Sequence, residues 1–113
     1  MMLVLDNNIF FSLMRPYSSD SYVFFSLRAK FFAPEYIKSE LAKHKSECLS
    51  KSKLSEQEFE MRHAEVDGKI KFCKLLEYKK FLKEAINALP DPKDSPYLAL
   101  ALSIKAAIWS NDP

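Results

Sequence analysis

Short apolar runs alternate along this chain with longer segments of mixed polarity. Four of the short runs have strand character, because they are rich in branched or aromatic residues or alternate with a period of two. They lie at residues 3–5, 31–33 and 69–72 and in a last run through Trp109. The third run can also be read as the start of a helix over residues 71–82, and the pattern leaves that choice open.

The segments between these runs have helical periodicity and recognisable start and stop signals. They predict helices over residues 8–14, 19–28, 34–48, 55–68, 77–89 and 95–105. We expect Asn8 and Ser95 to act as N-caps and Pro34 to open its helix. Ser55 and Glu58 form a capping box, and Gly68 is suited to a left-handed helix end. In the helix over 19–28, the spacing places Tyr22 and Phe25 on the inner face.

This order of elements predicts an α/β fold. Strands that alternate with helical segments are typical of a mainly parallel sheet of about four strands with helices on both faces. A chain of 113 residues is long enough for one hydrophobic core, so we expect a single domain over residues 1–113.

Composition excludes several functional classes. The chain has one glycine, Gly68, whereas phosphate-binding loops and dinucleotide fingerprints need several. No apolar run approaches the roughly 18 residues of a membrane span, and the N-terminus lacks the basic region of a signal peptide. Cys48 and Cys73 have no CxxC spacing and are better explained as reduced thiols. We therefore expect a cytoplasmic protein without a membrane partner.

Four acidic residues lie where a parallel-sheet protein would present a site. Asp6 and Asp112 follow apolar runs, Asp94 precedes a helix, and Glu40 lies within one. Ligands bind outside the carboxyl ends of parallel strands, so these acids can converge there. Carboxylates about 4 Å apart repel by about 4 kcal/mol at an effective dielectric of about 20, which a cation would relieve. Hard oxygen ligands favour Mg²⁺ or Mn²⁺ over zinc.

Each acid also has an ordinary explanation. Asp94 can simply stabilise a helix start, and Asp6 and Asp112 can be turn residues. Glu40 alone is a typical solvated helix residue, and Asp91 competes with Asp94 for the third position. The joint pattern, rather than any single acid, indicates a site.

Four segments together resemble the PIN domain, and in particular the VapC-like toxins of type II toxin-antitoxin pairs and their uncharacterised prokaryotic relatives. The matching segments are LVLDNN at residues 3–8, APEYIKSEL at 33–41, DSPYLALA at 94–101 and IWSND at 108–112. The resemblance implies a three-layer α/β/α fold and a metal-dependent endoribonuclease that hydrolyses RNA phosphodiester bonds. It also implies a cognate antitoxin protein and a homodimer as partners.

The same resemblance assigns roles to residues. It matches Asp6, Glu40, Asp94 and Asp112 to the family's catalytic acids. Asp6, Asp94 and Asp112 would hold Mg²⁺ or Mn²⁺ directly or through water, and Glu40 would complete the shell or orient the attacking water. Asn8 and Ser110 match supporting polar positions.

Two departures from the family pattern leave a second reading open. Asn7 stands where the family usually has Ser or Thr, and the family pattern usually continues beyond position 113. We therefore expect an edge strand to be missing, and a catalytically silent module that binds RNA or protein is the alternative. A phosphorylated-aspartate receiver is a third class, but its adjacent acid pair cannot be located.

Basic residues offer two tracks for an RNA backbone, although each can equally be a solvated surface. One track comprises Lys38, Lys43, Lys45, Lys51 and Lys53, and the other Lys69, Lys71, Lys74, Lys79, Lys80 and Lys83.

Overall fold

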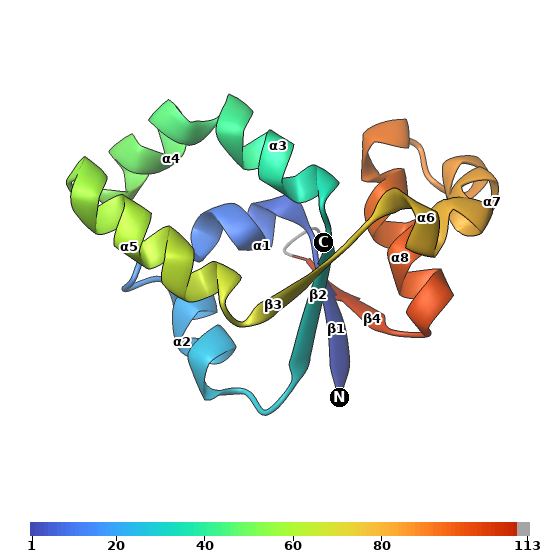
Figure 1. Cartoon of the computed structure of the whole chain (residues 1–113), viewed down its shortest axis with the longest axis horizontal. Coiled ribbons are helices and arrows are strands. Elements are labelled where there is room, and N and C mark those ends of the chain that lie inside the picture. The colour runs from blue at the N-terminus through green and yellow to red at the C-terminus, as the bar shows by residue number, and fades with distance from the viewer. Residues whose placement is uncertain (111–113) are drawn as a thin grey trace.

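The computed structural model describes residues 1–110 and contains one parallel sheet between two groups of helices (Figure 1). The strands are β1 (Met2–Leu5), β2 (Lys30–Pro34), β3 (Ile70–Cys73) and β4 (Ala107–Trp109). Their order in the sheet is β3-β2-β1-β4, and all three pairings are parallel. The predicted α/β fold with a parallel sheet is confirmed.

Helices cover both faces of this sheet. The first group is α1 (Asn7–Ser12), α2 (Ser19–Ser26), α3 (Tyr36–Lys43), α4 (Lys45–Ser52) and α5 (Glu56–Asp67). The second group is α6 (Leu75–Tyr78), α7 (Leu82–Ala88) and α8 (Ser95–Ile104), with the 3₁₀ turns η1 (Lys79–Phe81) and η2 (Pro92–Asp94). Figure 1 shows α1 to α5 on one side of the sheet and α6 to α8 on the other, which is the three-layer arrangement.

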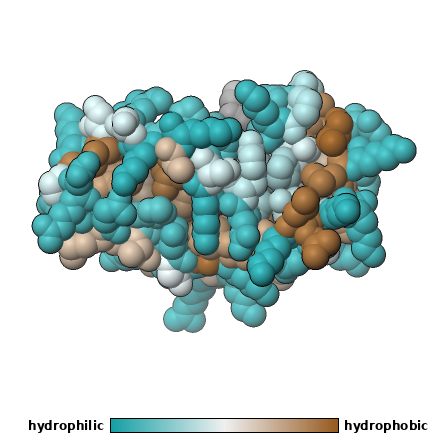
Figure 2. Space-filling model, turned by 45° about the horizontal axis from the view of Figure 1, so that its top comes forward, coloured by the Kyte–Doolittle hydropathy of each residue, from teal (hydrophilic) through white to brown (hydrophobic). Residues whose placement is uncertain are grey.

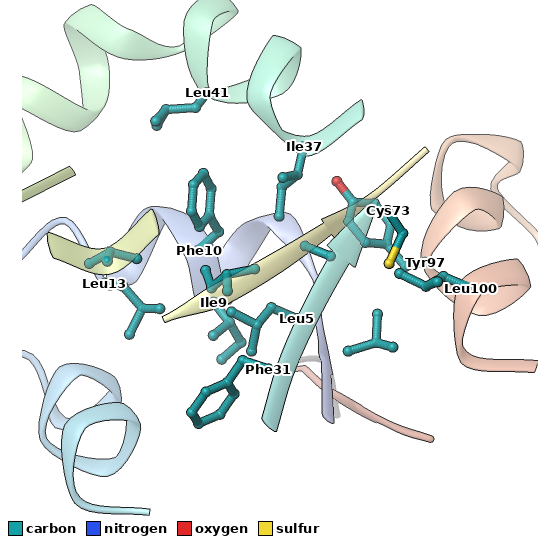
Figure 3. Close-up of a cluster of buried hydrophobic side chains, with 14 of the residues drawn as sticks. Leu5, Ile9, Phe10, Leu13, Phe31, Ile37, Leu41, Cys73, Tyr97 and Leu100 are labelled. Carbon is teal, nitrogen blue, oxygen red and sulfur yellow. The ribbon is translucent and has the colours of Figure 1, made fainter. Parts of the chain in front are cut away.

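The core lies where these helices pack on the strands. Val4 and Leu5 of β1 are fully buried, as are Ile9 and Phe10 of α1 and Leu100 of α8. Figure 3 shows Leu5, Ile9, Phe10 and Leu100 among the apolar side chains that converge on the sheet from both layers. Parallel strands are typically buried on both faces, so their apolar runs show little alternation.

The strand order places the topological switch point between β1 and β4. The chain moves from β1 to β2 and β3 on one side and returns to β4 on the other. Leu5 is paired with Trp109, and the backbone N–H of Asp6 donates to the carbonyl of Trp109 at 3.3 Å. Asp6 and Ser110 therefore leave the sheet side by side, at the position where open α/β sheets bind ligands.

Several local predictions are wrong in detail. The first helix is capped by Asp6 instead of Asn8, and Pro34 ends β2 instead of opening a helix. Ser95 is the first residue of α8 and not its cap. Gly68 ends α5 with a φ of −63°, so it is not left-handed, although the capping box of Ser55 and Glu58 is present.

Two predicted helices are interrupted, and a third, α2, buries a different face from the predicted one. The helix over 34–48 is divided at His44, and the segment over 77–89 contains η1. In α2, Phe24 is fully buried, whereas Tyr22 is 75% and Phe25 is 39% exposed. Cys48 and Cys73 are both free and buried. Within residues 1–110, no helix has the length and apolar character required to cross a membrane.

Candidate active site

Asp6 is held at the carboxyl end of β1 by the start of α1. One of its carboxylate oxygens, Oδ1, accepts a hydrogen bond of 2.9 Å from the backbone N–H of Ile9. This is an N-cap, which satisfies one of the donors left open at a helix start. The cap fixes the carboxylate beside the end of β4, so Asp6 has a structural role as well as a place in the candidate site.

Glu40 is the buried acid of the site. It lies on α3 and is only 8% exposed, so it is not the solvated helix residue that its sequence position alone would indicate. Tyr36 donates a hydrogen bond of 2.5 Å to its Oε1, and Nζ of Lys43 lies 3.5 Å from its Oε2. The bond from Tyr36, with a smaller contribution from Lys43, lowers the pKa of Glu40 against the opposing effect of burial. Glu40 is therefore an ionised carboxylate in a fixed position.

Asp94 is the last residue of η2 and directly precedes α8. It occupies the N-cap position of α8 but makes no side-chain capping hydrogen bond there. A side-chain capping bond is therefore not its role, although its negative charge still lies at the favourable end of the α8 dipole. Asp91, the competing acid, does cap η2, because its Oδ1 accepts a 3.0 Å bond from the backbone N–H of Lys93.

Tyr97 lies among these acids. Its side chain is 3% exposed, and its hydroxyl has no hydrogen-bond partner among residues 1–110. Figure 3 shows its ring extending from α8 with the hydroxyl oxygen pointing away from that helix. Burial is the main reason that the pKa of Tyr97 is raised far above its ordinary value, and nearby negative charges raise it further. Those carboxylates belong to Glu40, Asp6 and Asp94.

A second tyrosine connects the two sides of the site. The rings of Tyr36 and Tyr97 lie 6.3 Å apart in an edge-to-face arrangement. The hydrogen bond to Glu40 raises the pKa of Tyr36 to about 12, and the charges of Asp91 and Asp94 contribute. Glu40 and Asp94 thus act on both tyrosines, and Asp6, which follows β1, acts on Tyr97.

The convergence of these acids is looser than a complete metal site. Among residues 1–110, no three histidine, cysteine, aspartate or glutamate side chains are close enough to hold one ion. Asp112, the fourth predicted acid, lies outside the described residues. Ser110 lies beyond the end of β4 next to Asp6, and Asn8 is exposed on α1.

Sequence reasoning gave no role to the two tyrosines. Tyr36 precedes Glu40 by four residues and Tyr97 follows Asp94 by three, which are the spacings of neighbours on one helix face. A search for aromatic donors at these spacings from each candidate acid would have found both.

Comparison with known proteins agrees with the fold. A family model described as PIN domain matches residues 4–113. A search of curated proteins found no match. Since the model spans nearly the whole chain, from β1 to the segment after β4, this protein belongs to the PIN domain family.

Proposed function

We propose that this chain is a metal-dependent endoribonuclease that hydrolyses RNA phosphodiester bonds. PIN domains are generally nucleases, and those nucleases act on RNA. The observation that carries the proposal for this chain is the group of carboxylates, Asp6, Glu40 and Asp94, whose charges act together on the buried Tyr97. Carboxylates from distant segments that surround one buried side chain are a feature of functional sites.

The donor chemistry fits a hard divalent cation. The candidate ligands are carboxylate oxygens, which Mg²⁺ and Mn²⁺ prefer, and PIN domains generally use divalent metals. In the proposal, Asp6, Asp94 and Asp112 hold the ion directly or through water. Such an ion, when bound, would polarise the phosphodiester and help to generate the nucleophile.

The residues of the chain have separate tasks in this proposal. Both oxygens of Glu40 face donors, Tyr36 and Lys43, so this carboxylate is fixed in direction and suited to orienting a water molecule. Asp6 holds its position through the cap of α1. Asn8 and Ser110 remain proposed supporting residues at the rim of the site.

The direct test is RNA cleavage with Mg²⁺ or Mn²⁺ by the wild type and by Asp6→Asn and Asp94→Asn. We expect each substitution to lower the rate by about a hundredfold or more, because removal of one group that stabilises transition-state charge has this effect. Asp91→Asn is the matched control, since it removes the same charge three residues from Asp94 and keeps a side chain that can cap η2. Equal rates for all four proteins would discard the nuclease proposal.

A second candidate is a catalytically silent PIN module that binds RNA or a protein. It is favoured by the absence, among residues 1–110, of three metal-binding side chains within reach of one ion. RNA binding without cleavage, at any concentration of Mg²⁺ or Mn²⁺, would support this candidate.

The cellular role and the assembly state are proposals as well. We propose, from the resemblance to VapC-like proteins, a cytoplasmic toxin inhibited by an antitoxin. Growth arrest on expression of the wild type, but not of Asp6→Asn, would support this role. A small antitoxin gene next to the gene of this protein would also support it.

For a proposed homodimer, exposed Leu75, Leu76 and Ile86 offer apolar surface on the α6 and α7 side, where Figure 2 shows an apolar band. Light scattering would measure the mass in solution.

A further inference from the structure

One buried polar group of the candidate site has no task in the proposed function. The hydroxyl of Tyr97 has no hydrogen-bond partner among residues 1–110, although the side chain is only 3% exposed. A buried hydroxyl without a partner costs about 1–3 kcal/mol, and phenylalanine would fill the same space without that cost. A catalytic role or a bound ion is a recognised reason for such a group in a native structure.

The fold directs this hydroxyl toward the candidate acids. Tyr97 lies in the first turn of α8, three residues after Asp94, and α8 packs against β1 and β2. Helical side chains point back toward the start of their helix, so the ring of Tyr97 leans toward the end of α8 at which Asp94 lies. Figure 3 shows its oxygen pointing away from α8.

Glu40 is the acid whose charge acts most strongly on Tyr97. Burial is the main reason for the raised pKa of Tyr97, and Glu40 is the largest of the charges that add to it, ahead of Asp6 and Asp94. The ring of Tyr97 lies 6.3 Å from that of Tyr36, whose hydroxyl donates to Oε1 of Glu40 at 2.5 Å. Two tyrosines, one from α3 and one from α8, therefore lie near the same carboxylate.

The carboxylate of Glu40 can accept a further hydrogen bond. Its two oxygens offer about four acceptor positions. One position on Oε1 is taken by Tyr36, and Nζ of Lys43 lies 3.5 Å from Oε2. Lys43 is 65% exposed, so water competes for its ammonium group and weakens this contact. A donor from α8 would therefore not have to displace Tyr36.

We propose that Tyr97 is a positioning residue of the cation site, which donates its hydroxyl to the carboxylate of Glu40 when a divalent cation is bound. Without a cation, the acids repel one another and stay apart. Attraction to the cation would draw the carboxylates together and bring Glu40 within reach of Tyr97. The proposal rests on the proposed function and adds to it a residue that is not one of the acids.

A direct bond between Tyr97 and the cation suits this site less well. Mg²⁺ and Mn²⁺ prefer carboxylate and carbonyl oxygens and water. Burial and the nearby charges raise the pKa of Tyr97 well above its ordinary value, so its hydroxyl keeps its proton at neutral pH. A protonated hydroxyl is a donor, and donors that orient the carboxylates of a metal site are common in proteins.

The experiment measures cation affinity in the absence of RNA. The full chain is titrated with MnCl₂, and electron paramagnetic resonance of the free ion gives the dissociation constant. The test variant is Tyr97→Phe, which removes the hydroxyl and keeps the ring. The matched control is Tyr78→Phe, because Tyr78 of α6 is also 3% exposed. Urea unfolding in EDTA verifies that each variant is folded.

We expect Tyr97→Phe to weaken Mn²⁺ binding by about tenfold or more, because loss of a donor to a carboxylate of a metal site typically has this effect. Tyr78→Phe should stay within about twofold of the wild type, since no comparable partner is lost. Equal affinities of Tyr97→Phe and the wild type would overturn the proposal. Equal losses in both variants would also overturn it, because they would reflect the fold in general.

A double-mutant cycle identifies the carboxylate through which Tyr97 acts. In a Glu40→Gln background, Tyr97→Phe should change Mn²⁺ affinity by less than about threefold, because the charged acceptor has been removed. In an Asp91→Asn background, which also lacks one negative charge, the full loss should persist. A loss of about tenfold in both backgrounds would overturn the assignment to Glu40.

These outcomes separate the two proposals. Mn²⁺ binding that depends on the Tyr97 hydroxyl, without RNA cleavage, keeps the positioning role and removes the nuclease. RNA cleavage that depends on Asp6, while Tyr97→Phe binds Mn²⁺ as the wild type does, keeps the nuclease and removes the positioning role. No Mn²⁺ binding by the wild type at millimolar concentration would also remove the positioning role.

Discussion

The hydroxyl of Tyr36 donates a 2.5 Å hydrogen bond to Oε1 of Glu40, one turn further along α3. The bond directs a buried carboxylate and keeps it ionised, with Lys43 beside its second oxygen. Because a charged acceptor gains more from a hydrogen bond than a neutral one, Tyr36 stabilises the charged form of Glu40. Glu40 can therefore remain a carboxylate before any cation binds.

Replacing Tyr36 by Phe should raise the pKa of Glu40 and lower stability by about 1 kcal/mol at pH 7. The pKa of Glu40 is depressed in the folded protein, so its stabilisation is present above the ordinary glutamate pKa and is lost as pH falls through the folded value. The difference between Tyr36→Phe and the wild type should therefore vanish at low pH. Urea unfolding at a series of pH values measures it.

Tyr17→Phe is the control for this series, because Tyr17 is fully exposed. It should match the wild type at every pH. A loss in Tyr36→Phe that is the same at pH 7 and pH 3 would mean that lost packing, and not the charge of Glu40, is responsible.

Replacing Tyr97 by Phe should make the protein more stable by about 1 kcal/mol. The hydroxyl of Tyr97 is buried without a hydrogen-bond partner among residues 1–110, and such a group costs about 1–3 kcal/mol. In the proposed nuclease the same change should lower cleavage, since residues placed for function are often unfavourable for stability. Thermal unfolding and a cleavage assay on the same preparation measure both effects.

Tyr97→Leu separates the contribution of ring packing to stability from that of the hydroxyl. It removes the ring as well as the hydroxyl, and we expect a loss of about 2–3 kcal/mol from the resulting cavity. If Tyr97→Phe is destabilised as well, the hydroxyl has a favourable partner. The predicted gain in stability at the expense of cleavage would then be wrong.

Asp6 should show two separable effects, because it caps α1 and belongs to the candidate site. Asp6→Asn keeps a good N-cap and removes the charge, so cleavage should be lost with little change in stability. Asp6→Ala removes both and should also cost about 1 kcal/mol of unfolding free energy. Equal stability of the two variants in urea would show that the 2.9 Å bond to Ile9 does not contribute.

The strands and the layer order could be predicted from the sequence, because buried parallel strands leave short apolar runs that helices cannot reproduce at that length. The face of α2 could not. Phe24 and Phe25 are adjacent, so the pattern admits either as the buried ring, and packing against Phe31 at 4.5 Å selects Phe24. The interruptions of two predicted helices, at His44 and at η1, depend on the path that each connection takes across its helical layer. Local periodicity carries no information about that path.

The candidate site was predicted in part. The rule that ligands bind beyond the carboxyl ends of parallel strands anticipated Asp6, and the register confirms that Asp6 and Ser110 leave the sheet together. The burial of Glu40 was not foreseen, since one glutamate among lysines resembles a solvated face. The tyrosines were missed for the opposite reason, because an aromatic residue at helical spacing resembles core.

Two lysines, Lys53 and Lys105, have left-handed φ values of 60° and 57°, while Gly68, the one glycine of the chain, has a φ of −63°. A left-handed residue other than glycine costs about 1–2 kcal/mol, so Lys105→Gly at the end of α8 should be stabilising by about 1 kcal/mol. Gly68→Ala should stabilise as well, by about 0.4–1 kcal/mol, because alanine reduces the freedom of the unfolded chain.

Space at Gly68 allows this change, since an added Cβ would meet its nearest atoms, the carbonyl oxygens of Ala64 and Glu65, at 3.5 Å. Both variants lie outside the candidate site and should leave RNA cleavage unchanged. Lys93→Gly is the control, because Lys93 lies in a 3₁₀ turn with no left-handed φ, so glycine there should only add freedom to the unfolded chain. Urea unfolding should therefore order the variants with Lys105→Gly and Gly68→Ala above the wild type and Lys93→Gly below it. A Lys105→Gly variant less stable than the wild type would show that the lysine side chain stabilises the fold by more than its left-handed backbone destabilises it.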